Sequence, residues 1–383
     1  MRRAVPPNAY NRPRRITVRI YAYVQWIPLM ELETRKVQKL GYSSLGISLP
    51  KDWAEGLRLT PGTMVTVMRE EDGSLRIRAG PLQQPVERSE CIIDVESCNV
   101  PGSLHRLITG SYVVGRNTIR IRSREEIDPE QLQEIHDAVK RLTGLTIVNQ
   151  GSTFVTIENF AEPTRFPIEG LIRRLHYLTA RMEKLSFDCV IVGGSGLADE
   201  VKRLEEEVDR LYWLVVRQLL LAIKDRTVAS NVGETEPRRI VEDRVVASEL
   251  ENIGDLWRVV ARAFTELGDS RYKKSKDFIR VIQNLRQLLE NQIETTMNAF
   301  FGQDWILANA SLETHGKVME MSKELEALVP IQRTMKDPSF CTTCISVREM
   351  LTPIAQISGH YATIAQITIN RALQATEGVL PSK

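Results

Sequence analysis

Four carboxylates at helical spacing are the clearest chemical signal in this 383-residue chain. Glu205 and Asp209 are four residues apart, as are Glu251 and Asp255. In an α-helix this spacing places the two members of each pair on one face, one turn apart. Two such faces packed side by side would supply the oxygen ligands that hard and borderline metal cations prefer. The alternative is that these side chains simply face water, as most charged residues do.

The sequence around these carboxylates indicates where such a site would lie. At about 100° per residue, Glu251 and Asp255 lie opposite the apolar stripe of their own helix. The pattern therefore predicts a metal site on the surface of a helical bundle, outside its core. Glu206 and Glu207 are candidate additional ligands because they directly follow Glu205.

Basic and hydroxyl side chains cluster near the other end of the chain. The candidates are Arg35, Lys36, Lys39, Ser43, Ser44 and Lys51. Such side chains contact phosphate oxygens of nucleic acids, and a helix that begins near Lys51 would add free backbone N–H groups. However, residues 31–80 hold eight basic and seven acidic residues, so their net charge is only +1. A mixed-charge strand that faces water is therefore the alternative.

Six arginines and no acidic residue precede Met30. They predict a basic arm over residues 1–30 that contacts phosphates. Alternatively, Met30 is the true first residue, because the regular pattern begins just after it. The two interpretations remain equally open.

Composition and motifs exclude several classes of protein. Apolar residues make up 42% and charged residues 26%, which is typical of a globular chain, and no run of about 18 apolar residues would insert into a membrane. Five cysteines spread over the chain favour a reducing cytoplasm over a secreted disulfide scaffold. The chain has no nucleophile elbow, HExxH or dinucleotide fingerprint, so we expect no enzyme.

Two short motifs have plain interpretations. Cys341 and Cys344 form a lone CxxC that we expect in a loop, whereas a zinc site normally needs two such pairs or added histidines. Free thiols or a disulfide are the simpler alternatives. The segment from Gly193 to Gly196 lacks the Lys-Ser/Thr of a phosphate-binding loop, and we expect it to be a turn between helices.

The element pattern predicts a multidomain α+β protein. Residues 31–80 favour strands over 35–40 and 44–49, a helix over 51–57 and a hairpin over 64–78. So small a core would need a dimer to be stable. Residues 86–162 predict a small α+β domain, with Pro129 as the first residue of its second helix.

Residues 165–377 change to a helical period. We expect six helices, roughly 168–188, 197–225, 238–267, 275–301, 304–328 and 345–375. They would form two three-helix bundles, over 165–268 and 271–377. The third helix predicts a core stripe of Val246, Leu250, Ile253, Trp257, Val260 and Phe264.

Two passages resemble known families. The segment RKVQKLGYSSLGISLP from Arg35, followed by Lys51-Asp52-Trp53 and Pro61-Gly62, resembles the AbrB/SpoVT/MazE family of swapped-hairpin DNA-binding domains. The segments LEEEVDRLYWLVVRQL from Leu204 and ELENIGD from Glu249 resemble the PhoU family of phosphate-uptake regulators. Together the two resemble the archaeal-type phosphate uptake regulators.

These resemblances imply roles for particular residues. Arg35 and Lys36 stand at family positions for DNA contact, whereas Tyr42 replaces a second arginine. The acidic motifs of PhoU-like proteins hold metal clusters, which implies a divalent or iron-type cluster at the four carboxylates. In the second bundle Gln356 and His360 replace the two acids, with Glu320 and Glu324 as the nearest candidates. We therefore expect a weak or absent second site, and a hydrogen-bonded His360.

We accordingly predict a cytoplasmic, homodimeric, phosphate-responsive transcription regulator. Its partners would be operator DNA of phosphate uptake genes and a phosphate transporter ATPase. The alternative is a metal-bound PhoU-type adaptor that acts on the transporter by protein contact, with the N-terminal domain serving only to dimerise.

Overall fold

The computed structural model describes residues 33–42, 44–69, 73–80, 90–162, 165–193, 195–267, 276–327 and 338–375. The chain divides into two compact units between Pro85 and Val86. The predicted basic arm of residues 1–30 and the candidate Ser43 lie outside the described residues.

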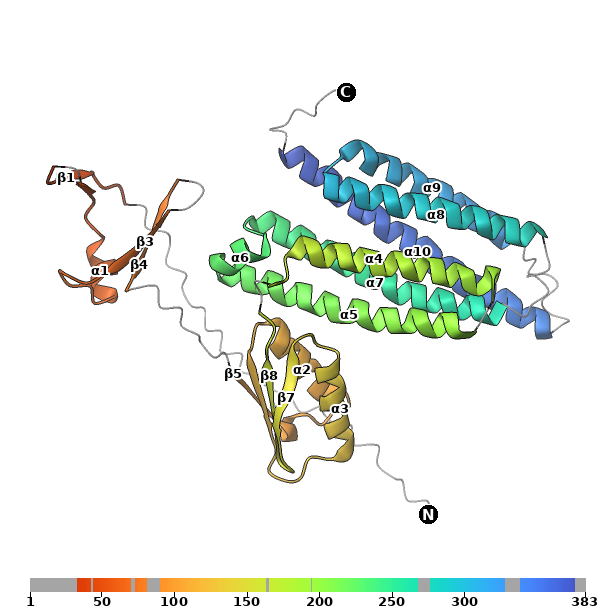
Figure 1. Cartoon of the computed structure of the whole chain (residues 1–383), viewed down its shortest axis with the longest axis horizontal. Coiled ribbons are helices and arrows are strands. Elements are labelled where there is room, and N and C mark those ends of the chain that lie inside the picture. Colours follow the sequence, from red (N-terminus) through yellow and green to blue (C-terminus); the bar gives the residue numbers. More distant parts are fainter. Residues whose placement is uncertain are drawn as a thin grey trace, which may run out of the picture. The chain divides into compact units, whose positions relative to one another are not determined.

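The N-terminal unit contains two antiparallel hairpins and a short helix (Figure 1). Its elements are β1 (Gln38–Leu40), β2 (Ser44–Gly46), α1 (Lys51–Gly56), β3 (Val65–Arg69) and β4 (Leu75–Ala79). The first hairpin is shorter than predicted, because only the three residue pairs next to the turn at Gly41 are in register. Gly41 adopts a φ of 71°, which favours glycine.

None of the described residues of this unit is buried. Its apolar side chains are instead exposed: Leu45 exposes 75% of its surface, Leu75 61% and Val67 55%. Burying one large aliphatic side chain is worth about 1.5–3 kcal/mol. The described residues of a single copy therefore form no buried core that would stabilise the unit.

The next segment folds into a four-stranded mixed sheet with two helices on one side (Figure 1). Its elements are β5 (Glu90–Asp94), the 3-10 helix η1 (Val95–Ser97), α2 (Ser103–Val113), β6 (Thr118–Arg122), α3 (Pro129–Lys140), β7 (Leu145–Gln150) and β8 (Phe154–Asn159). The strand order is β5-β6-β8-β7, and only β5 and β6 are parallel. Ile119 and Ile121 are buried whereas Arg120 and Arg122 are exposed, so one face of β6 meets the core and the other faces water.

The described residues from Ile168 onward are mostly helical, as their period predicted. The elements are α4 (Ile168–Ile191), α5 (Ser195–Lys224), α6 (Arg226–Val232), α7 (Pro237–Leu267), α8 (Lys276–Gly302), α9 (Trp305–Ala327) and α10 (Pro338–Ala375). None of the described helices is long and apolar enough to cross a bilayer.

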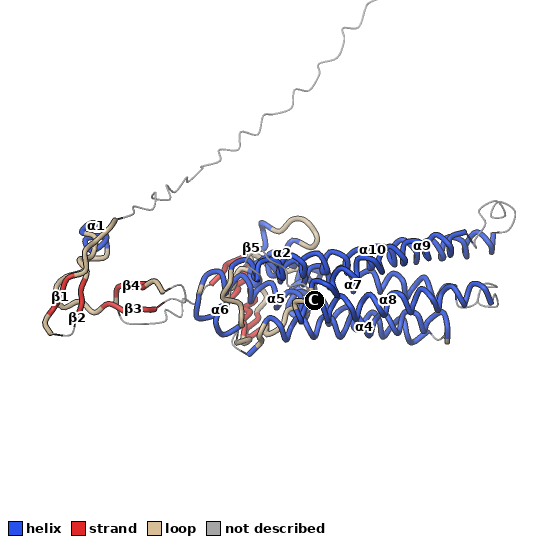
Figure 2. The backbone as a smooth tube through the Cα atoms, turned by 90° about the horizontal axis from the view of Figure 1, so that it is seen from above, coloured by secondary structure: helices blue, strands red, loops and turns tan. Residues whose placement is uncertain are grey.

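The long helices form two groups of three that pack against each other. α4, α5 and α7 pack together, as do α8, α9 and α10, and the groups meet mainly through α7 and α10. Figure 2 shows that the long helices run along a common direction. All six residues of the predicted core stripe on α7 are fully buried. The prediction of a multidomain α+β protein with paired three-helix groups is therefore confirmed.

Arg217 of α5 fastens the mixed sheet to these helices. It is only 3% exposed and donates hydrogen bonds to the backbone oxygens of Tyr112 and Arg116 and to Oδ1 of Asn117. Its guanidinium carbon also lies 4.8 Å from the centre of the Tyr112 ring. A buried charged group is tolerated only when it is hydrogen-bonded in this way.

The helix boundaries correct two predictions. The short helix α6 was missed, although Asp225 caps it by accepting a hydrogen bond from the Thr227 N–H at 2.7 Å and Gly233 ends it at a φ of 81°. α10 begins at Pro338, so Cys341 and Cys344 lie within a helix and the predicted loop is wrong. A proline favours the first turn of a helix, where its missing N–H costs nothing.

Candidate metal centre

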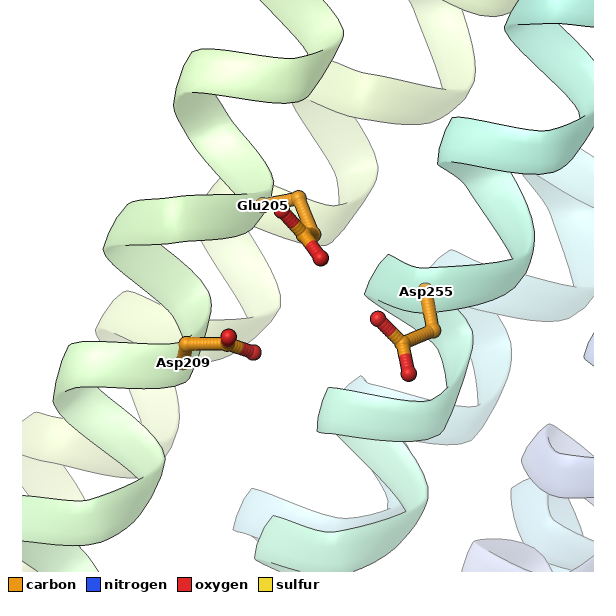
Figure 3. Close-up of side chains that lie close together, drawn as sticks. All are labelled: Glu205, Asp209 and Asp255. Carbon is orange, nitrogen blue, oxygen red and sulfur yellow. The ribbon is translucent and has the colours of Figure 1, made fainter. Parts of the chain in front are cut away.

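Three of the four predicted carboxylates meet in a groove between α5 and α7. Glu205 and Asp209 project from successive turns of α5, and Asp255 faces them from α7 (Figure 3). One carboxylate oxygen from each residue lies within 4.8 Å of the other two. The spacing places Glu205 and Asp209 on one face of α5, and the packing of α5 against α7 brings the predicted Asp255 to them.

Gly254 is the residue that lets α5 and α7 approach here. A Cβ at this position would lie 3.2 Å from Cγ1 of Val208, tighter than most side-chain contacts. Because Gly254 directly precedes Asp255, the missing side chain brings the two acidic faces together. An Ile or Leu at position 254 would push the helices apart.

The fourth predicted ligand, Glu251, lies one turn before Asp255 on α7 and outside the group of three. It is still close enough to interact electrostatically with Asp255, Asp209 and Glu205. We therefore regard Glu251 as a neighbour of the centre.

Burial perturbs the carboxylates of the groove. Loss of hydration, reinforced by the Asp209 charge, raises the pKa of Glu205 to about 7. Loss of hydration and the Asp255 charge raise the pKa of Glu251 to about 7 and also raise the pKa of Asp209. Arg258 offsets these effects only in part, through an ion pair of 3.3 Å with Glu205. Negative charge in the groove is thus under-compensated, an environment that suits a bound cation.

The centre lies at the surface of the helical bundle, as predicted, but the mixed-sheet segment partly covers it. The Glu205 side chain is only 13% exposed. The groove opens into a cleft whose other wall is α3 of the mixed-sheet segment, with Arg141 and Lys140 among its lining residues. The sheet segment covers a face that would be open in the helical bundle alone.

The two additional candidate ligands lie in different places. Glu207 forms an ion pair of 2.7 Å with Arg174 of α4 and is therefore engaged elsewhere. Glu206 lines the cleft beside Glu205.

The corresponding part of the second helical group contains a different arrangement. Nδ1 of His360 on α10 bonds to the carboxylate of Glu249 on α7. Glu320 and Glu324, the acids predicted nearest to it, are exposed on α9. His360 is thus hydrogen-bonded as predicted, but its partner comes from the other helical group, because α7 and α10 pack against each other.

Sequence reasoning missed the basic residues around the centre. Arg258 follows Asp255 by three residues, and this spacing alone would have placed both on one helix face. Lys140 and Arg141 gave no such signal, since only the docking of α3 brings them to the cleft.

The candidate DNA-contacting residues of the N-terminal unit are exposed where they are described. Arg35 donates to Glu33 and, at 3.2 Å, to Oγ of Ser48. Nζ of Lys51 lies 3.7 Å from Oε1 of Glu55, within ion-pair distance. Lys36 and Lys39 make no ion pair within the described part of the chain, so their charges are available.

The chain is similar to two protein families. Residues 172–264 match the PhoU domain, and residues 38–84 match the bacterial antitoxin MazE, described as antidote-toxin recognition. A crystal structure of PhoU from Pseudomonas aeruginosa has 18% sequence identity and a TM-score of 0.47, covering 55% of this chain and 96% of that chain. No curated protein gives a significant match.

Proposed function

We propose that this chain, which carries a MazE-like domain at its N-terminus and a PhoU domain in its helical region, is a cytoplasmic, phosphate-responsive regulator that binds DNA near phosphate uptake genes. The pairing of these two domains in one chain carries the proposal. The PhoU domain supports regulation of phosphate uptake, and the MazE-like domain is compatible with DNA binding. No catalytic chemistry is needed for this role.

The exposed apolar residues of the N-terminal unit support a homodimer. Leu45 in β2 and Val67 in β3 are more than half exposed, and none of the described residues of this unit is buried. Pairing with a second copy would remove these side chains from water and supply the missing core. Two joined units would also double the number of lysines and arginines available to DNA.

DNA binding is expected to depend on Lys36, Lys39 and the dimer. Changing both lysines to alanine should weaken binding and make the slope of log affinity against log salt less steep by about 2 per copy, since each lost phosphate contact removes about 0.9. Leu45→Asp should give monomers and lose binding. The measurements are fluorescence anisotropy with duplex DNA from upstream of a phosphate transporter operon, and light scattering for mass.

Lys317→Ala is the control, because it also removes an exposed lysine but lies on α9, outside the N-terminal unit. Unchanged affinity in the Lys36 and Lys39 variant would contradict the assigned DNA surface.

The alternative is an adaptor that acts on a transporter ATPase by protein contact. The small charge of residues 31–80 and the ion pairs of Arg35 and Lys51 favour it, because they leave few free cations for DNA. Capture of the ATPase by a protein that fails to bind any DNA would support the adaptor.

We also propose that Glu205, Asp209 and Asp255 hold a divalent or iron-type cation. Three oxygen donors in a half-buried groove, with raised pKa values at Glu205 and Asp209, fit a hard or borderline metal. The ion would neutralise the groove and fix α5 against α7. A ligand can shift such a protein between two conformations only if it binds one of them more tightly than the other.

Removal of the acidic ligands should remove the metal. We expect Asp209→Asn combined with Asp255→Asn to lose most of the metal that the wild type retains, because two of three anionic ligands become neutral. Elemental analysis of protein purified without chelators measures this. Glu207→Gln is the control, since Glu207 lies on the same helix but pairs with Arg174. Equal metal content in the double variant and the wild type would contradict the site.

A further inference from the structure

The cleft beside the acidic groove has an unusual lining. It has a volume of about 380 Å³ and lies between α3 on one side and α5 and α7 on the other. Its lining residues are all charged: Asp137, Lys140, Arg141, Lys202, Glu205, Glu206, Asp209, Arg210 and Arg258. An apolar ligand gains nothing in such a cleft, and its volume is at the small end of the range for ligand sites. The cleft therefore suits a small, charged ligand.

Most of the cations that line the cleft lack a carboxylate partner. Only Arg258 forms an ion pair, with Glu205. In the ranges that the structure describes, Lys140, Arg141, Lys202 and Arg210 have no carboxylate within 4 Å. Arg141 interacts with the Asp209 charge only at longer range. Of the acids that line the cleft, Glu205 and Asp209 lie together with Asp255 between α5 and α7, and Asp137 accepts a hydrogen bond from Gln133 at 3.0 Å. Cationic charge is thus left available for an added anion.

The types of cation narrow the class of anion. Arg141, Arg210 and Arg258 carry planar guanidinium groups, whose paired N–H donors match the oxygens of phosphate or carboxylate groups. Lys140 and Lys202 add compact positive charges. Such a set, drawn from three helices around a small cleft, favours a multiply charged tetrahedral oxyanion over a chloride ion.

We propose that this cleft binds inorganic phosphate, with Lys140 at the end of α3 and the following Arg141 on one side of the ion and Arg258 of α7 on the other. The inference rests on the proposed function, because it names the ligand through which the PhoU-type body would respond. It also assigns a role to the mixed-sheet segment, which supplies two of the three cations.

Phosphate in this position would fasten α3 to the helical body. Arg217 and the bond from Oγ1 of Thr143 to the backbone oxygen of Arg210, at 3.5 Å, already attach the sheet segment to α5. A ligand held by Arg141 and Arg258 would add a second attachment, next to the acidic groove.

Calorimetric titration of the full-length protein with inorganic phosphate tests the proposal, in chelator-treated samples and in samples loaded with Mn²⁺. We expect binding that Arg141→Ala and Lys140→Ala each weaken by about 10- to 100-fold, since each removes a charge-assisted hydrogen bond. Arg141→Lys should recover part of the affinity, and Lys317→Ala should leave it unchanged. Thermal unfolding without phosphate verifies that the variants are folded.

Two further arms separate the possible outcomes. Titration with sulfate and with AMP distinguishes inorganic phosphate from other oxyanions and from phosphate esters; a preference for either over phosphate overturns the ligand assignment. Absence of phosphate binding in both metal states would overturn the site. So would Arg141→Ala and Lys140→Ala variants that bind phosphate as tightly as the wild type does. If the protein binds DNA but not phosphate, only the inferred phosphate site is contradicted. If it binds phosphate but not DNA, only the proposed DNA-binding role is contradicted.

Discussion

Replacing Arg371 with methionine is expected to lower the free energy of unfolding by about 3–5 kcal/mol, because it leaves a buried carboxylate without its cationic partner. Arg371 of α10 is 9% exposed and donates from Nε to Glu242 and from Nη2 to Asp243, each at 2.6 Å. Asp243 is only 2% exposed. Urea unfolding followed by far-UV circular dichroism measures the loss.

The environment of Asp243 explains why the loss should be large. Burial, followed by the Asp243 charge, raises the pKa of the neighbouring Glu234 to about 8. Glu234 is therefore protonated at neutral pH, because its surroundings oppose added negative charge. Without Arg371, the buried Asp243 carboxylate would lose the guanidinium group that donates to it.

Two control variants separate this effect from loss of packing. Arg371→Met combined with Asp243→Asn removes both charges and should recover part of the stability. Arg280→Met on α8 breaks an exposed pair of 3.3 Å with Asp277 and should cost less than about 0.5 kcal/mol. A cost below about 1 kcal/mol for Arg371→Met would contradict a stabilising role for this ion pair.

Local periodicity accounts for what the sequence predicted well. Every third or fourth residue of α7 from Val246 to Phe264 is apolar, and all the predicted stripe is buried, because a helix in a bundle needs one continuous apolar face. The same arithmetic placed Glu205 and Asp209 on one face of α5. Distances along one helix are fixed by its geometry and need no tertiary information.

Contacts between elements account for what the sequence did not predict. Both acids of α7 were predicted as ligands, but only Asp255, next to Gly254, joins the α5 pair, whereas Glu251 lies one turn away. His360 pairs with Glu249 across the two helical groups, a contact that no spacing in either segment encodes. Lys140 belongs to the same class, because only the docking of α3 places it in the cleft.

The residue pattern also did not predict which polar side chains are buried. Glu183 lies on the apolar side of α4 and is 1% exposed, although its type is usually on the surface. Its Oε1 has no hydrogen-bond partner in the described structure. Such a residue is expected to make stability depend strongly on pH.

Glu183→Gln should flatten the pH dependence of stability. Burial, followed by repulsion from Glu290, raises the pKa of Glu183 from 4.5 to about 8, despite nearby Arg286. A carboxyl with a raised pKa favours the folded state only while it is neutral, so the wild type loses this advantage as pH rises from about 4.5 to 8. One pKa unit corresponds to about 1.4 kcal/mol, so between pH 5 and 9 the variant should gain about 4 kcal/mol relative to the wild type.

Urea unfolding of both proteins across this pH range measures the difference, which isolates Glu183 from other titrating groups such as Glu234. Glu294→Gln is the matched control, because Glu294 is an exposed carboxylate on α8 and its replacement should leave the pH profile unchanged. The glutamine adds a buried N–H₂ group and can lower stability at every pH, but that cost is independent of pH. A constant difference between the Glu183 variant and the wild type from pH 5 to 9 would therefore show that the carboxyl does not ionise at a raised pKa.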